Sequence, residues 1–80
     1  MTESEQANIT VRFGKAMRKR RWELGLSQEE LAIRSGLHRT YVADIERGSR
    51  NISLRSIEKI ARGLEIPIWT LLAKYGVEDL

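Results

Sequence analysis

The outward face of a predicted helix carries Thr40, Ala43, Asp44 and Arg47, with Arg39 at its border. The side chains of Arg39, Thr40 and Ala43 suit contact with the edges of nucleic-acid bases. The guanidinium of Arg39 can donate two parallel hydrogen bonds to O6 and N7 of guanine. Thr40 and Ala43 are small, so a helix that carries them can approach the floor of a DNA major groove. Thr40 can also bond a phosphate or a base, or touch a thymine methyl group. An ordinary amphipathic surface helix without a ligand is the alternative interpretation.

Other polar side chains near this face could contact a phosphate backbone. Gln28 lies in the first turn of the preceding helix, where free backbone N–H groups favour an anion, although glutamine is also simply a good helix former. His38 can cap its helix or contact a phosphate. Tyr41 leans toward the core, so we predict it equally as a core or a contact residue. The loop after the helix would follow the DNA backbone, enter an adjacent groove, or stay solvated, and its candidates are Arg47, Ser49, Arg50 and Asn51.

Composition excludes several classes of protein. The chain has 80 residues, 41% hydrophobic and 31% charged, which is typical of one folded domain. It has no cysteine and one histidine, so we expect no disulfide, no metal site and no cofactor. No catalytic residue is predicted, because His38 has no nucleophile or orienting carboxylate at a defined spacing. The polar start of the chain does not resemble a signal peptide, so we expect a cytoplasmic protein without a membrane partner, located at the nucleoid through DNA.

The positive charge is concentrated in one part of the chain. Residues 9–50 hold ten Lys and Arg against five Asp and Glu, a net +5, whereas residues 51–80 hold four of each. This asymmetry favours a polyanion as partner. A basic face that only confers solubility is the alternative.

Apolar residues recur every three or four positions, which predicts an all-α fold. We expect a flexible segment over residues 1–8 and a single DNA-binding domain over residues 9–80, with helices at about 10–24, 28–35, 39–47, 54–62 and 67–75. Ser27 and Glu30 form a capping box, and Gly63 is expected to end the fourth helix. Because only Leu37 separates Gly36 from the next cap position, the second and third helices should meet steeply, as a helix-turn-helix unit.

Glu46 lies on the helical wheel beside the buried side of the third helix, so its carboxylate needs a partner. Arg21, on the flank of the apolar stripe of the first helix, is the candidate for a bidentate ion pair. Arg20 competes for that role. Trp22 lies opposite the stripe, where it either covers the N-terminal segment or is exposed.

The string GLSQEELAIRSGLHRTYVADIERGSRNISLRSIEKIARGL closely resembles the helix-turn-helix domain of the Cro and phage-repressor (Xre) family. Within it, HRTYVADIERGSRNISL is most similar to the controller proteins of bacterial restriction-modification systems. This resemblance implies a five-helix Cro/repressor-like domain, a symmetric homodimer and a third helix in the major groove. By position it implies a phosphate contact for Gln28, groove reading by Arg39 and Thr40, and an ion pair between Glu46 and Arg21. It also implies DNA contacts at the positions of Tyr41, Arg50 and Asn51.

The last predicted helix, PIWTLLAKYG, is too apolar to be covered on one side alone. We therefore expect a two-fold homodimer interface there, formed by Ile68, Trp69, Leu72 and Tyr75. Pro67 and Trp69 depart from residues frequent in similar proteins, so the details of this surface stay open.

The expected function is sequence-specific transcriptional regulation rather than catalysis. The preferred interpretation is a restriction-modification controller that activates or represses from a pseudo-palindromic, double-stranded DNA operator. Binding of two dimers and contact with RNA polymerase stay open. The alternatives are a phage-type or antitoxin-type repressor, or an adaptor that uses the same fold to bind protein instead of DNA.

Overall fold

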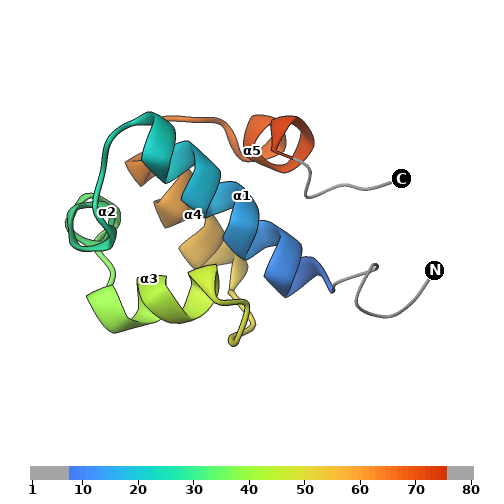
Figure 1. Cartoon of the computed structure of the whole chain (residues 1–80), viewed down its shortest axis with the longest axis horizontal. Helices are drawn as coiled ribbons and strands as arrows, with labels where there is room; N and C mark the ends of the chain where they lie inside the picture. Colours follow the sequence, from blue (N-terminus) through green and yellow to red (C-terminus); the bar gives the residue numbers. More distant parts are fainter. Residues whose placement is uncertain (1–7, 76–80) are drawn as a thin grey trace.

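The computed structural model describes residues 8–75, and within this range the chain forms five helices and no strand (Figure 1). The helices are α1 (Ile9–Glu23), α2 (Gln28–Ser35), α3 (Arg39–Glu46), α4 (Leu54–Gly63) and α5 (Ile68–Lys74). The prediction of an all-α fold is confirmed, and each predicted helix bound lies within one residue of the observed one. The flexible segment predicted over residues 1–8 falls, except for Asn8, outside the described residues.

Side-chain caps start the first four helices. The Asn8 side chain accepts a hydrogen bond from the backbone N–H of Val11, and Ser53 accepts one from Ser56. Ser27 and Glu30 form both bonds of the predicted capping box, at 3.0 and 2.9 Å. These bonds satisfy N–H groups that have no partner inside a helix, and they explain why short-range sequence signals located the helix starts so well.

Gly36 ends α2 in the left-handed conformation, with φ of 66°. Gly63 is the last residue of α4, so the helix ends within one residue of the prediction, but Gly63 is not a left-handed cap: Leu64 is the C-cap, and Glu65 has the positive φ. The physical reason for glycine at this position is packing, because a Cβ atom on Gly63 would collide with Oγ of Ser35 in α2. Gly63 therefore allows α2 and α4 to approach closely.

The core lies where α1 packs against α3 and α5, and where α2 packs against α3 and α4 (Figure 1). Its side chains are apolar or small, and they come from all five helices: Phe13, Ala16, Met17, Leu31, Ala32, Val42, Ile45, Ile60, Leu64, Leu71 and Tyr75. Gly14 is also buried, and a Cβ atom there would lie 2.7 Å from the carbonyl oxygen of Glu46. α1 thus rests directly on the backbone of α3. Every helix in residues 8–75 falls short of the length and apolarity needed to cross a membrane.

Candidate nucleic-acid interface

One side of α3 is buried and the other is open to solvent. Val42 and Ile45 are completely or almost completely buried, whereas Arg39, Thr40 and Arg47 are exposed and Ala43 is half-buried. His38 caps this helix, since its Nδ1 accepts a hydrogen bond from the backbone N–H of Thr40 at 3.3 Å. No described part of the chain covers this narrow polar side, so a ligand can reach it.

The buried ion pair predicted for α3 is present. The Arg21 guanidinium donates two hydrogen bonds to the Glu46 carboxylate, at 2.7 and 2.9 Å, and a third to the carbonyl oxygen of Leu26 at 2.9 Å. The side chain of Glu46 is fully buried. Arg20, the competing candidate, donates to the carbonyl oxygens of Leu64 and Glu65 after the end of α4.

Gln28 joins the same network. Its side-chain Nε2 donates to a carboxylate oxygen of Glu46 at 3.0 Å, and Arg18 lies 3.6 Å from that oxygen. The carboxylate therefore connects α1, α2 and α3. Gln28 is half-buried and lies beside exposed Arg39 in a shallow hollow at the start of both α2 and α3. Sequence reasoning placed Gln28 toward a ligand and missed the hydrogen bond from its side-chain amide to Glu46, because residues 18 positions apart share no local signal.

Tyr41 is half-buried at the edge of the core. Its ring packs partly against the core, and its hydroxyl donates to Oγ of Ser56 at 3.1 Å. The guanidinium carbon of Arg50 lies 5.1 Å from the ring centroid, which is a cation–π distance. Ser56 was missed from the sequence, where it is visible only as a residue in the first turn of a helix.

The end of α3 and the loop after it are organised by Asp44. Its carboxylate accepts a hydrogen bond from Arg47, and Nε of Arg50 lies 3.6 Å from the other carboxylate oxygen. Ser49 donates to the main-chain carbonyl of Asp44 at 3.1 Å. Asn51, which follows Arg50 in the chain, is exposed to solvent. Sequence analysis put Asp44 on the outward face of α3 without a role, since helical spacing does not show how a loop folds back.

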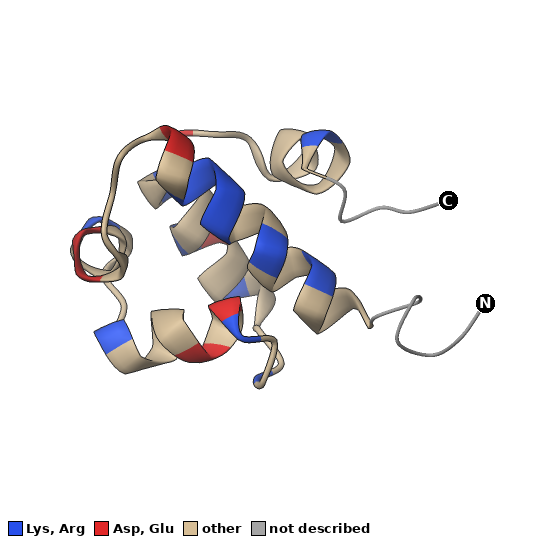
Figure 2. Cartoon of the chain, in the orientation of Figure 1, with Lys and Arg blue, Asp and Glu red and all other residues tan. Residues whose placement is uncertain are grey.

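Basic side chains gather along α1 as well as at the ends of α3 (Figure 2). Lys15 and Lys19 are exposed on α1. The net positive charge of residues 9–50 therefore lies on α1, α2, α3 and the loop after α3. Among residues 8–75, no group of three His, Cys, Asp or Glu side chains is arranged to hold a metal ion.

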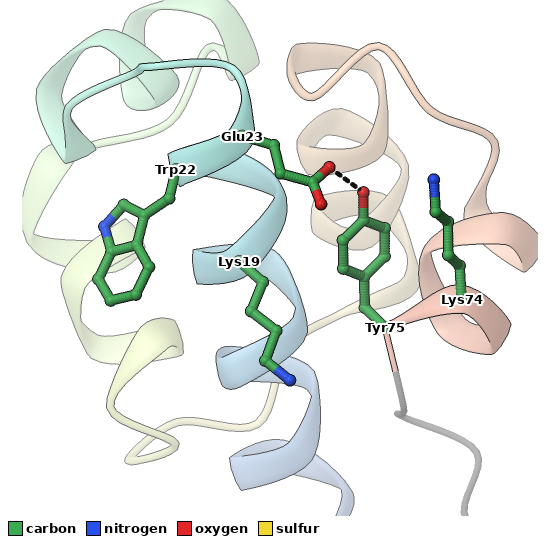
Figure 3. A pocket seen from close by; sticks show the side chains of 5 residues that line it. All are labelled: Lys19, Trp22, Glu23, Lys74 and Tyr75. Carbon is green, nitrogen blue, oxygen red and sulfur yellow. Dashed lines mark hydrogen bonds between the residues drawn. The ribbon is translucent and has the colours of Figure 1, made fainter.

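Trp22 lies at a hollow between α1 and α5 (Figure 3). Trp22 is 62% exposed at its rim, with the Arg18 guanidinium 5.9 Å from its ring. Inside the hollow, the Tyr75 hydroxyl donates to Glu23, which lowers the pKa of Glu23 and raises that of Tyr75. Tyr75, predicted for a dimer interface, is only 8% exposed, because most of its ring is buried in its own chain.

The other residues predicted for an interface lie on an apolar surface. Ile68 and Leu72 are half-buried and line a hollow together with Leu54 and Ile57 of α4. Leu54 is 85% exposed, and Trp69 on α5 is 74% exposed. Sequence reasoning missed Leu54, although a leucine directly after the cap residue Ser53 is a signal that could have found it. A second apolar hollow extends from Leu72 and Ile57 to α1.

Comparison with known proteins gives a consistent result. Residues 15–68 match the helix-turn-helix family. The chain is 50% identical over 60 residues to control protein C.BamHI of Bacillus amyloliquefaciens, covering 74% of each chain. It is 45% identical to control protein C.MunI of a Mycoplasma species, covering 82% of this chain and 90% of that protein.

Solved structures show the same similarity. The restriction-modification controller protein C.AhdI from Aeromonas hydrophila superposes with a TM-score of 0.76 at 50% identity, covering 78% of this chain and 94% of that one. C.Esp1396I bound to a 19 base pair DNA duplex superposes with a TM-score of 0.81 at 36% identity, covering 86% and 92% of the two chains.

Proposed function

This chain belongs to the helix-turn-helix family and within it to the restriction-modification control proteins, and from that premise we propose that it regulates transcription from a pseudo-palindromic operator. Members of this family are DNA-binding transcriptional regulators and not enzymes. In the proposal, α3 enters the major groove, Arg39 and Thr40 contact base edges, and Gln28 and His38 contact phosphates. Activation or repression then depends on how much of the operator is occupied.

The uncovered side of α3 carries this proposal. Arg39 is exposed at the N-terminal end of the helix, and its small neighbours leave room for a groove wall. The buried bonds between Arg21 and Glu46 hold α3 against α1, so the helix can be inserted as a rigid unit. The loop side chains Arg47, Ser49, Arg50 and Asn51 would extend the contact along the DNA.

A two-fold dimer completes the proposal. Trp69, Ile68 and Leu72 of α5, together with Leu54 and Ile57 of α4, supply an exposed apolar surface that a second copy would cover. Such a dimer would hold two α3 helices about 34 Å apart, one turn of DNA, and so match a palindrome. A second dimer on the same operator, or a contact with RNA polymerase, would let occupancy select the direction of control. The protein would act in the cytoplasm, at the nucleoid.

Selection of bound duplexes from a random-sequence pool tests this function. We expect enrichment of a pseudo-palindrome whose half-sites lie about one helical turn apart. The selected duplex should bind at least about a thousandfold more tightly than a scrambled duplex of equal length. A pool without enrichment would contradict DNA recognition and favour an adaptor that binds protein. Enrichment of a single half-site would contradict the dimer.

A further inference from the structure

We propose that Asp44 is a positioning residue of the DNA interface, which orients Arg50 for its ligand and weakens binding to unrelated DNA. The inference rests on the proposed function. Asp44 is an acidic residue on the groove side of α3, where a polyanion would otherwise be repelled. The contacts of the Asp44 carboxylate explain why an acidic residue is present on this side.

One carboxylate serves two arginines. Oδ1 of Asp44 accepts from Arg47, and Oδ2 faces Nε of Arg50 at 3.6 Å. The Asp44 side chain is 18% exposed, whereas those of Arg47 and Arg50 are 61% and 55% exposed. The Asp44 carboxylate therefore lies beneath the two arginine side chains, and these arginines face the solvent from which DNA would approach.

Arg50 is oriented from two directions. Asp44 faces its Nε, and the ring of Tyr41 lies beneath its guanidinium carbon at 5.1 Å. Among residues 8–75, no hydrogen bond occupies its two terminal amino groups. Those groups are the fork that binds a phosphate or a guanine in parallel hydrogen bonds. Because a long side chain loses rotamer freedom when it binds, holding Arg50 in place beforehand strengthens the contact.

The same carboxylate discriminates against unrelated DNA. Non-specific binding depends on cations that neutralise phosphates, and Asp44 offsets one of the two arginine charges. In a non-specific complex, the DNA phosphates are not aligned with the terminal groups of Arg47 and Arg50, so they must compete with Asp44 for these arginines. In the complex with the operator, Arg50 keeps its contact with Asp44 and binds the DNA through its two terminal amino groups. Asp44 thus lowers non-specific affinity more than specific affinity.

The test compares two substitutions of Asp44 with a matched control. Asp44→Asn removes the charge and keeps an acceptor oxygen, while Asp44→Ala removes both. Glu65→Gln is the control, since it also raises the net charge by one and breaks an exposed pair, with Arg34 at 2.8 Å, away from α3. Each protein is titrated with the duplex selected by the wild type and with a scrambled duplex of the same composition, over a range of salt. Circular dichroism checks that each variant is folded.

We expect both Asp44 variants to bind the scrambled duplex several-fold more tightly, with a salt dependence steeper by about one phosphate contact. The ratio of specific to non-specific affinity should fall about tenfold in Asp44→Ala and less in Asp44→Asn. Glu65→Gln should leave the ratio within about twofold of the wild type.

Two results would overturn the role of Asp44: ratios in both variants equal to that of Glu65→Gln, or equal ratios in Asp44→Asn and Asp44→Ala. A wild-type chain that does not prefer any selected duplex would instead overturn the proposed function and this inference with it. The two failures are therefore distinguishable in one set of titrations.

Discussion

The guanidinium of Arg21 in α1 and the carboxylate of Glu46 at the end of α3 face each other in the interior, joined by hydrogen bonds of 2.7 and 2.9 Å. Gln28 donates to the same carboxylate from α2. The helix that carries the candidate DNA-reading residues is therefore fixed by a charged network behind it, while its outer side stays free. Within α3, buried Glu46 holds the helix in place, and exposed Arg39 and Thr40 remain available for recognition.

Glu46→Ala should lower the free energy of unfolding by about 3–5 kcal/mol, because it leaves the buried Arg21 charge without a partner. Urea denaturation at neutral pH measures the change. Arg34→Ala, which breaks an exposed pair with Glu65, is the control and should cost at most about 1 kcal/mol. An equal loss in the free energy of unfolding in the two variants would show that the buried pair contributes no more to stability than the exposed pair.

Arg39→Ala should weaken binding to the selected duplex by about 1–3 kcal/mol and relax the preference at one base position in each half-site. The fold should be unaffected, since Arg39 is exposed. Band-shift titration against all four bases at each position measures both effects. Arg55→Ala, an exposed arginine on α4, is the control. A uniform loss across all sequences would assign Arg39 to a phosphate instead.

Leu54→Glu should convert a dimer to a monomer. Leu54 is 85% exposed at the start of α4, so the substitution removes apolar contact with a second copy without opening the core. An acid in the first turn also suits the helix dipole, and the monomer should stay folded. Sedimentation at micromolar concentration reads the outcome, with Ile33→Glu, on the 74% exposed Ile33 of α2, as control. A wild-type monomer would contradict the interface.

The Tyr75–Glu23 hydrogen bond should make stability depend on pH at both extremes. It lowers the native pKa of Glu23 below 4.5, so its contribution is present above pH 4.5 and is lost as pH falls through the native value. It raises the native pKa of Tyr75 above 10.0, so the contribution is lost again as pH rises through that value.

Tyr75→Phe should remove the dependence at high pH, weaken the one at low pH, and return the pKa of Glu23 toward 4.5; Lys74 and Arg20 would still lower it. Thermal unfolding of the two proteins across this range, with an NMR titration of the Glu23 carboxyl group, measures the effect. A difference in melting temperature that is constant at all pH values would mean that the hydroxyl group acts only through packing.

Gly14→Ala should destabilise the fold by about 1–3 kcal/mol and weaken DNA binding as well, because the new methyl group would push against the backbone of α3. Gly25→Ala is the control. Gly25 has φ of 69° with open space around it, so alanine there is strained by about 1 kcal/mol without moving α3. If Gly14→Ala bound the selected duplex as tightly as the wild type at equal folded fraction, the contact would not position α3.

The local signals of this chain specify its elements. The capping bonds at Ser27 and Ser53 and the left-handed Gly36 act between residues a few positions apart, and periodic apolar residues mark each buried face. These interactions are encoded within single turns, so the helix bounds and the outward face of Arg39 and Thr40 could be predicted. The ion pair of Arg21 with Glu46 joins residues 25 positions apart, and it was predicted from the place of each residue on its helical wheel and from the family resemblance. The expectation of a two-fold dimer came from the apolar last helix together with the resemblance to a known family.

Most contacts between distant segments could not be predicted from these local signals. The hydrogen bond from Gln28 to Glu46 and the burial of Tyr75 against Glu23 depend on how the helices are placed in three dimensions. The contact of Arg50 with Asp44 depends on how the loop after α3 folds back. Gly63 shows the difference most clearly: its sequence context suggested a helix end, but the closeness of α2 is what excludes a side chain. Hydrogen bonds and close packing act over a few ångströms, so their partners are known only once the folded backbone brings distant residues together.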